Sequence, residues 1–242
     1  MTETKDWIQA SWNTGINLLR TPAAKLSGAA RNLLVVPIRS LGPAHRERIA
    51  QHLLALAPAD RYLRFGYAAS DEHVRRYAEQ LNFERDEIFG IYNRRLELIA
   101  MAHLAYAATE AHSECAEFGV SVLEHARGRG YGARLFDRAA MHARNADVRM
   151  LFIHALSENT PMLKIARAAG ALVRRDGSES EAFLELPPAN FDSRMTEAVE
   201  HQFAEFDYRL KLQAHQFWSF LGSLQAARNA TRHSGTGNQP LP

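Results

Sequence analysis

The stretch EHARGRGYGARLF, residues 124–136, alternates three glycines, Gly128, Gly130 and Gly132, with arginine and tyrosine. It follows the run 114–124, whose alternating apolar side chains predict a strand, and it leads into a run typical of a helix. Glycine lets the backbone approach a ligand closely, and the first N–H groups of a helix have no partner within the helix. A strand, a glycine-rich turn and a helix start therefore predict a site for an anion such as a phosphate.

Three phosphate-binding motifs can be compared with this turn. A P-loop requires Lys followed by Ser or Thr after its last glycine, whereas Ala133 and Arg134 stand there. A Rossmann turn requires G-x-G-x-x-G early in a βαβ unit, and these glycines have a different spacing. The third motif, R/Q-x-x-G-x-G/A, is satisfied by Arg127, Gly130 and Gly132. A turn that only joins strand to helix is the alternative interpretation.

The segments on either side predict a mixed α/β domain over residues 32–190, with a mixed, mostly antiparallel sheet flanked by helices. Caps, periodicity and turn residues predict strands at 32–38, on both sides of the hairpin at 93–95, at 114–124, at 149–156 and as a final pair over 171–186. The same signals predict helices at 42–58, 70–81, 132–146 and 159–170.

These motifs resemble the GNAT family of N-acetyltransferases, in which the R-x-x-G-x-G loop binds the pyrophosphate of acetyl-CoA. Three stretches, AEFGVSV, RGRGYG and SENTPMLKIARAAGA, look most like the catalytic domain of bacterial protein lysine acetyltransferases. The stretch ADRYLRF, residues 59–65, resembles a segment between the first two helices of the same group. The resemblance covers about residues 32–188 and implies the GNAT fold there.

The resemblance implies an acetyl-CoA-dependent N-acetyltransferase that transfers an acetyl group directly to an amine. A protein lysine side chain is the leading acceptor. A small-molecule amine, such as a polyamine or a metabolite, is the second. A non-catalytic binding or scaffold protein that keeps the fold is a further alternative. The residues that the resemblance places at acetyl-CoA are Val120, Val122, Arg127, Gly128, Arg129, Gly130, Tyr131, Gly132, Ala133 and Asn159.

Acetyl transfer to lysine requires a base, because a free lysine amine has a pKa near 10.4 and is almost wholly protonated at neutral pH. Glu117 stands where the lysine acetyltransferase group has its catalytic glutamate. The alternation of a strand predicts that its neighbours Ala116 and Phe118 face the other side of the sheet. Glu114 is the next candidate, and a solvated or ion-paired Glu117 without a catalytic role is the alternative.

The acid that protonates the departing thiolate is not identified by the sequence. Many GNAT relatives carry a tyrosine seven residues after Asn159, where this chain has Ala166. Ser157 and His154 are the remaining candidates. The single Cys115 is expected to be inert, because direct transfer needs no thiol and a buried cysteine is usually unreactive. The histidines are scattered, so we expect no metal site.

Composition excludes several classes of protein. With 29 Lys and Arg against 27 Asp and Glu among 242 residues, no bulk charge points to nucleic acid or to an anionic membrane. No signal peptide and no membrane-spanning segment are expected. One cysteine rules out an intrachain disulfide, and we expect a cytoplasmic protein.

Helical extensions are predicted at both ends, over 1–31 and 191–228, followed by a disordered tail at 229–242. The C-terminal helix carries an apolar stripe with heptad-like spacing, formed by Val199, Phe203, Phe206, Leu210, Ala214, Phe217, Leu221 and Leu224. Such a stripe needs a partner, and we expect a homo-oligomer built by the helix at 192–228 with help from residues 5–20. Packing of the stripe onto the catalytic domain of the same chain is the alternative.

Overall fold

The computed structural model describes residues 36–107 and 114–234. The helix expected at 1–31 and the last eight residues of the chain lie outside these ranges, so that helix stays a prediction. The part that is described forms a single compact unit.

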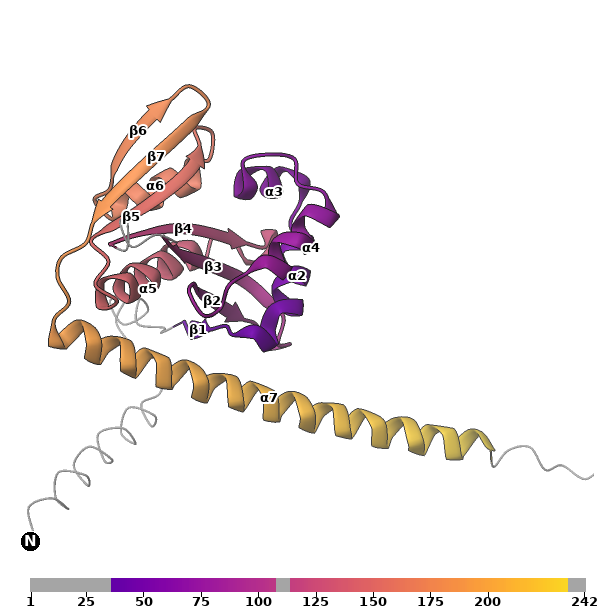
Figure 1. Ribbon diagram of the computed structural model, residues 1–242. Helices are drawn as coiled ribbons and strands as arrows, with labels where there is room; N and C mark the ends of the chain where they lie inside the picture. Colours follow the sequence, from indigo (N-terminus) through magenta and orange to yellow (C-terminus); the bar gives the residue numbers. More distant parts are fainter. Residues whose placement is uncertain (1–35, 108–113, 235–242) are drawn as a thin grey trace, which may run out of the picture. The chain divides into compact units, whose positions relative to one another are not determined.

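A seven-stranded sheet is the centre of this unit, with the strand order β1-β2-β3-β4-β5-β7-β6 (Figure 1). Neighbouring strands are antiparallel except β4 and β5, which are parallel. The mixed, mostly antiparallel sheet expected from the sequence is therefore confirmed. The strands are β1 (Arg39–Ser40), β2 (Glu87–Tyr92), β3 (Leu98–Tyr106), β4 (Cys115–Val122), β5 (Met150–Leu156), β6 (Leu172–Asp176) and β7 (Glu179–Glu185).

Helices cover both faces of the sheet (Figure 1). On one face, α5 and α6 enclose a core in which Phe118 and Phe136 meet edge to face at 5.0 Å between ring centroids. On the other face, α2 and α4 bury Ile49, Leu53 and Val74 against β2 and β3. The helices are α2 (Arg46–Leu54), α3 (Pro58–Phe65), α4 (Asp71–Gln80), α5 (Tyr131–Asn145), α6 (Thr160–Ala168) and α7 (Phe191–Ser234), with short 3-10 turns at Pro43–His45 and Glu124–Ala126.

The hairpin between β2 and β3 forms where the sequence predicts it. The side chain of Asn93 accepts hydrogen bonds from the backbone N–H groups of Arg95 and Glu97, at 2.8 and 3.0 Å. This is the local bonding by which asparagine favours turns. It fixes the register in which Glu87 opposes Leu104.

The structure differs from the two elements expected at the start of the domain. Of the strand expected at 32–38, residues 32–35 lie outside the described ranges, residues 36–38 have no regular structure, and the two-residue strand β1 follows at Arg39–Ser40. The helix expected over 42–58 ends at Leu54. A further helix that the sequence did not predict, α3, follows, with Pro58 in its first turn and Gly66 closing it at a φ of 79°. Proline at the start and left-handed glycine at the end are the usual signals of a short helix.

The long helix α7 continues to Ser234, beyond position 228 where the sequence predicts its end. It packs on α5 and β1 through a side that includes the buried residues Ser193 and Ala204. The large apolar side chains Val199, Phe206 and Leu210 are exposed instead. The alternative in which this stripe covers the catalytic domain of the same chain is therefore wrong for these residues.

Neither α7 nor any other helix within the described ranges is long and apolar enough to cross a membrane.

Candidate active site

The parallel strands β4 and β5 separate in the middle of the sheet. They are paired over only three positions, from Cys115 opposite Met150 to Glu117 opposite Phe152. Both strands continue beyond this point, and β5 stays paired with β7 up to Leu156. A gap therefore opens between the two strands directly after Glu117.

The backbone of β4 presents polar groups to this gap. The N–H of Leu123 bonds to the carbonyl of Ile99 on β3 at 3.0 Å, and these two residues continue the register of the antiparallel pair. Because the bonding side alternates along an antiparallel strand, the odd-numbered residues of β4 bond to β3. The N–H and C=O groups of Val120 and Val122 consequently face the gap.

The glycine-rich loop lies between β4 and the start of α5. Gly128 and Gly130 have φ values of 75° and 74°, in the left-handed region, and a Cβ at either position would meet no atom within 4 Å. Gly130 also caps α5, and no side chain caps that helix start. Gly132 lies close to α6, since a Cβ there would be 3.1 Å from Ile165 Cδ1. Open space, left-handed glycines and an uncapped fifteen-residue helix fit a bound pyrophosphate.

The other predicted loop residues occupy different environments. The guanidinium of Arg127 forms an ion pair with Asp60 of α3, and its Nε donates to the Val122 carbonyl at 3.4 Å. Arg129 and Ala133 are exposed, whereas Tyr131 is half-buried against the α5 side of the core. The structure thus brings these residues together around the loop, with Arg127 already engaged by an acid.

Glu117 is exposed on the opposite face of β4 from α5. Its neighbours Ala116 and Phe118 are buried in the core, which confirms the expected alternation. Glu117 also helps to raise the pKa of His103, although burial and Arg64 outweigh it and leave that pKa below the ordinary value. A carboxylate in this position is accessible to an amine that arrives from solvent.

A chain of hydrogen bonds that the sequence analysis did not find lies beside Glu117. The guanidinium of Arg64 covers Gly119, where a Cβ would be 3.0 Å from it. Arg64 donates to Tyr77 Oη at 2.8 Å, and Tyr77 lies 2.7 Å from His103 Nδ1. Asp86 Oδ2 is 3.1 Å from the other ring nitrogen. Because Asp86 accepts there, His103 carries its proton on Nε2 and Tyr77 donates to Nδ1.

On the same face, a buried histidine ties α2 to β4. His52 Nδ1 is 2.8 Å from the Leu98 carbonyl and Nε2 is 2.8 Å from Ser121 Oγ. The carbonyl can only accept, so Nδ1 donates to it and Nε2 accepts from the serine hydroxyl. Burial lowers the pKa of His52 to about 4, which keeps the ring neutral at pH 7. This contact holds β4 at the residue between Val120 and Val122.

Asn159 caps α6, as the sequence predicts. Its Oδ1 accepts from the Met162 N–H at 3.2 Å, and its Nδ2 donates to the Leu63 carbonyl of α3 at 3.4 Å. The side chain therefore links the start of α6 to α3. Its assignment to the pantetheine arm stays a prediction.

None of the positions considered for the general acid is well suited to that role. Ala166 is fully buried in the core on α6. Ser157 Oγ is bonded within the β6–β7 turn, 3.1 Å from the Gly177 carbonyl and 2.9 Å from that of Glu179. His154 is exposed on β5. Within the described ranges, no three His, Cys, Asp or Glu side chains are grouped as a metal site would require.

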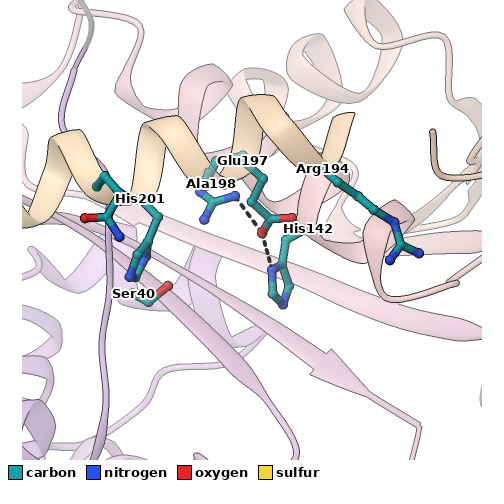
Figure 2. A pocket seen from close by; sticks show the side chains of 8 residues that line it. Ser40, His142, Arg194, Glu197, Ala198 and His201 are labelled. Atoms are coloured by element: carbon teal, nitrogen blue, oxygen red, sulfur yellow. Dashed lines mark hydrogen bonds and ion pairs between the residues drawn. The ribbon is translucent and has the colours of Figure 1, made fainter. Parts of the chain in front are cut away.

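A separate cavity of about 440 Å³ lies under α7, lined by Ser40, Arg138, His142, Arg194, Glu197, Ala198, His201 and Gln202 (Figure 2). Glu197 accepts from Arg138 Nη1 at 2.8 Å, His142 Nδ1 at 2.5 Å and Asn145 Nδ2 at 2.6 Å. Burial raises the pKa of Glu197, but these hydrogen bonds outweigh it and lower the pKa to about 2. The acid is satisfied within the protein, so the cluster clamps α7 to α5.

Known proteins resemble this chain in sequence and in fold. The profile of the Acetyltransferase (GNAT) family matches residues 49–171, and no curated protein matches the chain. The GNAT domain of S. lividans PAT has a TM-score of 0.53 and 21% identity, covering 62% of this chain and 89% of that one. An acetyltransferase of the GNAT family from Streptococcus pneumoniae has a TM-score of 0.51 and 10% identity, covering 62% and 98%. At such identities, the similar structures show the fold alone.

Proposed function

This chain belongs to the GNAT family of acetyltransferases, and from that premise we propose that it transfers an acetyl group directly from acetyl-CoA to a protein lysine side chain. The observation that carries the proposal is the gap after Glu117. An accessible carboxylate and the β4 amides that face the gap lie along this strand, and the open glycine-rich helix start follows it in the chain.

The donor side of the site is formed mainly by backbone. The N–H groups at the start of α5, freed by Gly128 and Gly130, would hold the pyrophosphate of acetyl-CoA. Arg129 is exposed beside them and adds positive charge. The amides of Val120 and Val122 face the gap and would bind the thioester carbonyl oxygen, where negative charge develops as the amine attacks. The thioester supplies an activated acetyl group and a thiol as the leaving group.

Glu117 would act as the base. It takes a proton from the acceptor ammonium, directly or through water, and the free amine then forms the new C–N bond as the C–S bond breaks. Its exposure supports an acceptor carried on the surface of another protein. Transfer needs no strong acid at the sulfur, because a thiol with a pKa near 8.5 is a tolerable leaving group near neutral pH. Transfer is therefore compatible with the buried Ala166, which can donate no proton to the sulfur.

Charge beside Glu117 favours a lysine over a polyamine. The guanidinium of Arg64 lies over Gly119, the next residue of β4 on the same face, and the bond to Tyr77 holds it there. A fixed positive charge close to the base repels an acceptor that carries several ammonium groups, more strongly than one with a single amine. A small metabolite with one amine is the remaining alternative.

The test is release of free thiol from acetyl-CoA by the full chain, with pools of protein and of small amines as acceptors. We expect release with protein, together with acetylated lysines in the peptides after proteolysis. Release only with small amines would contradict the lysine acceptor. No release with any acceptor, despite binding of CoA, would favour the non-catalytic alternative. The single Cys115 is compatible with a reducing compartment such as the cytoplasm, whichever acceptor the test identifies.

We also propose that the chain forms a homo-oligomer through α7. Val199, Phe206 and Leu210 are 61%, 62% and 50% exposed although they belong to a stripe with heptad-like spacing. Burying each such side chain is worth roughly 1.5–3 kcal/mol, so the stripe favours a partner. A period near 3.5 residues is typical of packing against another helix, and α7 of a second copy presents the same stripe.

A further inference from the structure

The short helix α3 lies beside the gap and contacts both β4 and β5 (Figure 1). Its Asp60 is ion-paired with Arg127 of the glycine-rich loop. Its Leu63 carbonyl accepts from Asn159 at the start of α6. These two contacts connect α3 to elements on both sides of the gap.

The partners of α3, Arg127 and Asn159, are residues that the family resemblance places at acetyl-CoA. While Arg127 is paired with Asp60 and donates to the Val122 carbonyl, its guanidinium is directed toward α3 and β4. The same group cannot give its full charge to a pyrophosphate in that position. The side chain of Asp60 is only 16% exposed, so the ion pair is less screened than a surface pair.

We propose that Asp60 is a positioning residue that holds Arg127 against α3 in the free protein and competes with the donor pyrophosphate for it. This inference rests on the proposed function. Binding of CoA exchanges one anion for another at the guanidinium, and α3 then loses a bond to the cofactor loop. Because Arg64 of the same helix lies over Gly119 beside Glu117, the exchange couples the donor site to the acceptor side.

The competition predicts the direction in which the affinity for CoA changes when Asp60 is neutralised. Neutralising Asp60 removes the internal anion while Arg127 stays, so the pyrophosphate no longer has to displace a partner. We expect Asp60→Asn to bind CoA roughly two- to fivefold more tightly, which corresponds to the strength of one partly exposed ion pair. A residue that merely supported the site would weaken binding when it is replaced.

Calorimetry with CoA on the full chain tests this direction. Asp71→Asn is the matched control. Asp71, at the start of α4, pairs with Arg61 of α3, but the side chain of Asp71 is 65% exposed. We expect the control to bind CoA as the wild type does. With Arg127→Met as background, Asp60→Asn should change the affinity less than twofold, since the cation for which the two anions compete is gone. Unchanged or weaker binding by Asp60→Asn in the wild-type background would overturn the inference.

Hydrogen exchange on the wild type provides a readout that needs no variant. We expect the backbone amides of α3 after Pro58 to exchange faster once CoA is added, because α3 loses its bond to Arg127. No change in this helix would overturn the inference while CoA binding itself still supports the proposed function. If the wild type does not bind CoA, the proposed function fails and this inference fails with it.

Discussion

Glu117 is the last residue of β4 that pairs with β5, and its carboxylate is exposed. Glu117→Gln keeps the shape but removes the base, so we expect kcat to fall by about 10²–10⁴ while CoA affinity stays within about twofold. Glu114→Gln is the control, since Glu114 is exposed at the start of the strand and lies 3.5 Å from Arg149. Steady-state rates from pH 6 to 9 provide the measurement. Wild-type rates in Glu117→Gln would show that the base lies elsewhere.

Gly130 is a second single position at which the proposal can fail. Gly130→Glu puts bulk and negative charge at an open, left-handed site in the glycine-rich loop, and we expect CoA binding to be lost. Gly177→Glu is a matched control, because Gly177 is also left-handed and open but lies in the β6–β7 turn. Calorimetry should therefore detect normal affinity in the control. Equal affinity in both variants would contradict the assignment of the loop to the pyrophosphate.

His52 links stability to pH through its buried ring. Its folded pKa of about 4 lies below the ordinary 6.5, so the unfolded chain takes up a proton first as the pH falls. Stability is therefore lost between pH 6.5 and 4, by roughly 2 kcal/mol at pH 5 relative to neutral pH. We expect His52→Gln to lack this part of the pH dependence in urea unfolding at pH 7.5 and 5. The exposed His73 provides the control His73→Gln, which should retain it.

At the scale of elements, α7 is held to α5 by charge and not by its apolar stripe. Glu197→Ala leaves the buried Arg138 without its carboxylate, and removing one partner of a buried pair costs about 3–5 kcal/mol. We expect α7 to detach, which limited proteolysis and hydrogen exchange over Phe191–Lys211 would detect. Glu200→Ala, one turn further along the helix, should leave α7 in place. Wild-type protection in Glu197→Ala would contradict the clamp.

The helices and strands also show where prediction from hydrophobic periodicity succeeds. β2 and β3 flank the predicted hairpin, and β4, α4, α5 and α6 begin and end within about two residues of the predicted ranges, because each has strong caps, turns or alternation. The helix α3 was missed although Pro58 and Gly66 bound it. Eight residues are too few for a helical period to stand out from a connection.

At the scale of the molecule, the proposed homo-oligomer depends on the exposed stripe of α7. Phe206→Glu combined with Leu210→Glu places two charges on the stripe without touching the contacts of α7 with the catalytic domain. We expect light scattering to show an oligomer for the full chain and a monomer for this double variant. Thr196→Glu with Gln213→Glu, two exposed polar positions of the same helix, should remain oligomeric. A wild-type chain of monomer mass at micromolar concentration would contradict the proposal.

Point variants are better suited to this question than removal of the helix. A chain that ends at Asn190 would lack Glu197, and the buried Arg138 would lose its partner. Loss of stability would then be confused with loss of assembly. The charged stripe variants keep the clamp to α5 and change only the exposed side.

The sequence by itself determined the glycine turn, the helix caps and the alternation that puts Glu117 and Phe118 on opposite faces of β4. Each of these features depends on bonds and periods within a few residues. It also contained the motifs that resemble those of the GNAT family. Only the tertiary structure decided the gap between β4 and β5, the pairing of Asp60 with Arg127 and the inward polar side of α7. Each joins residues far apart in the chain, and Arg138 shows the reason: a buried cation requires an acid, and only the fold determines that Glu197 supplies it.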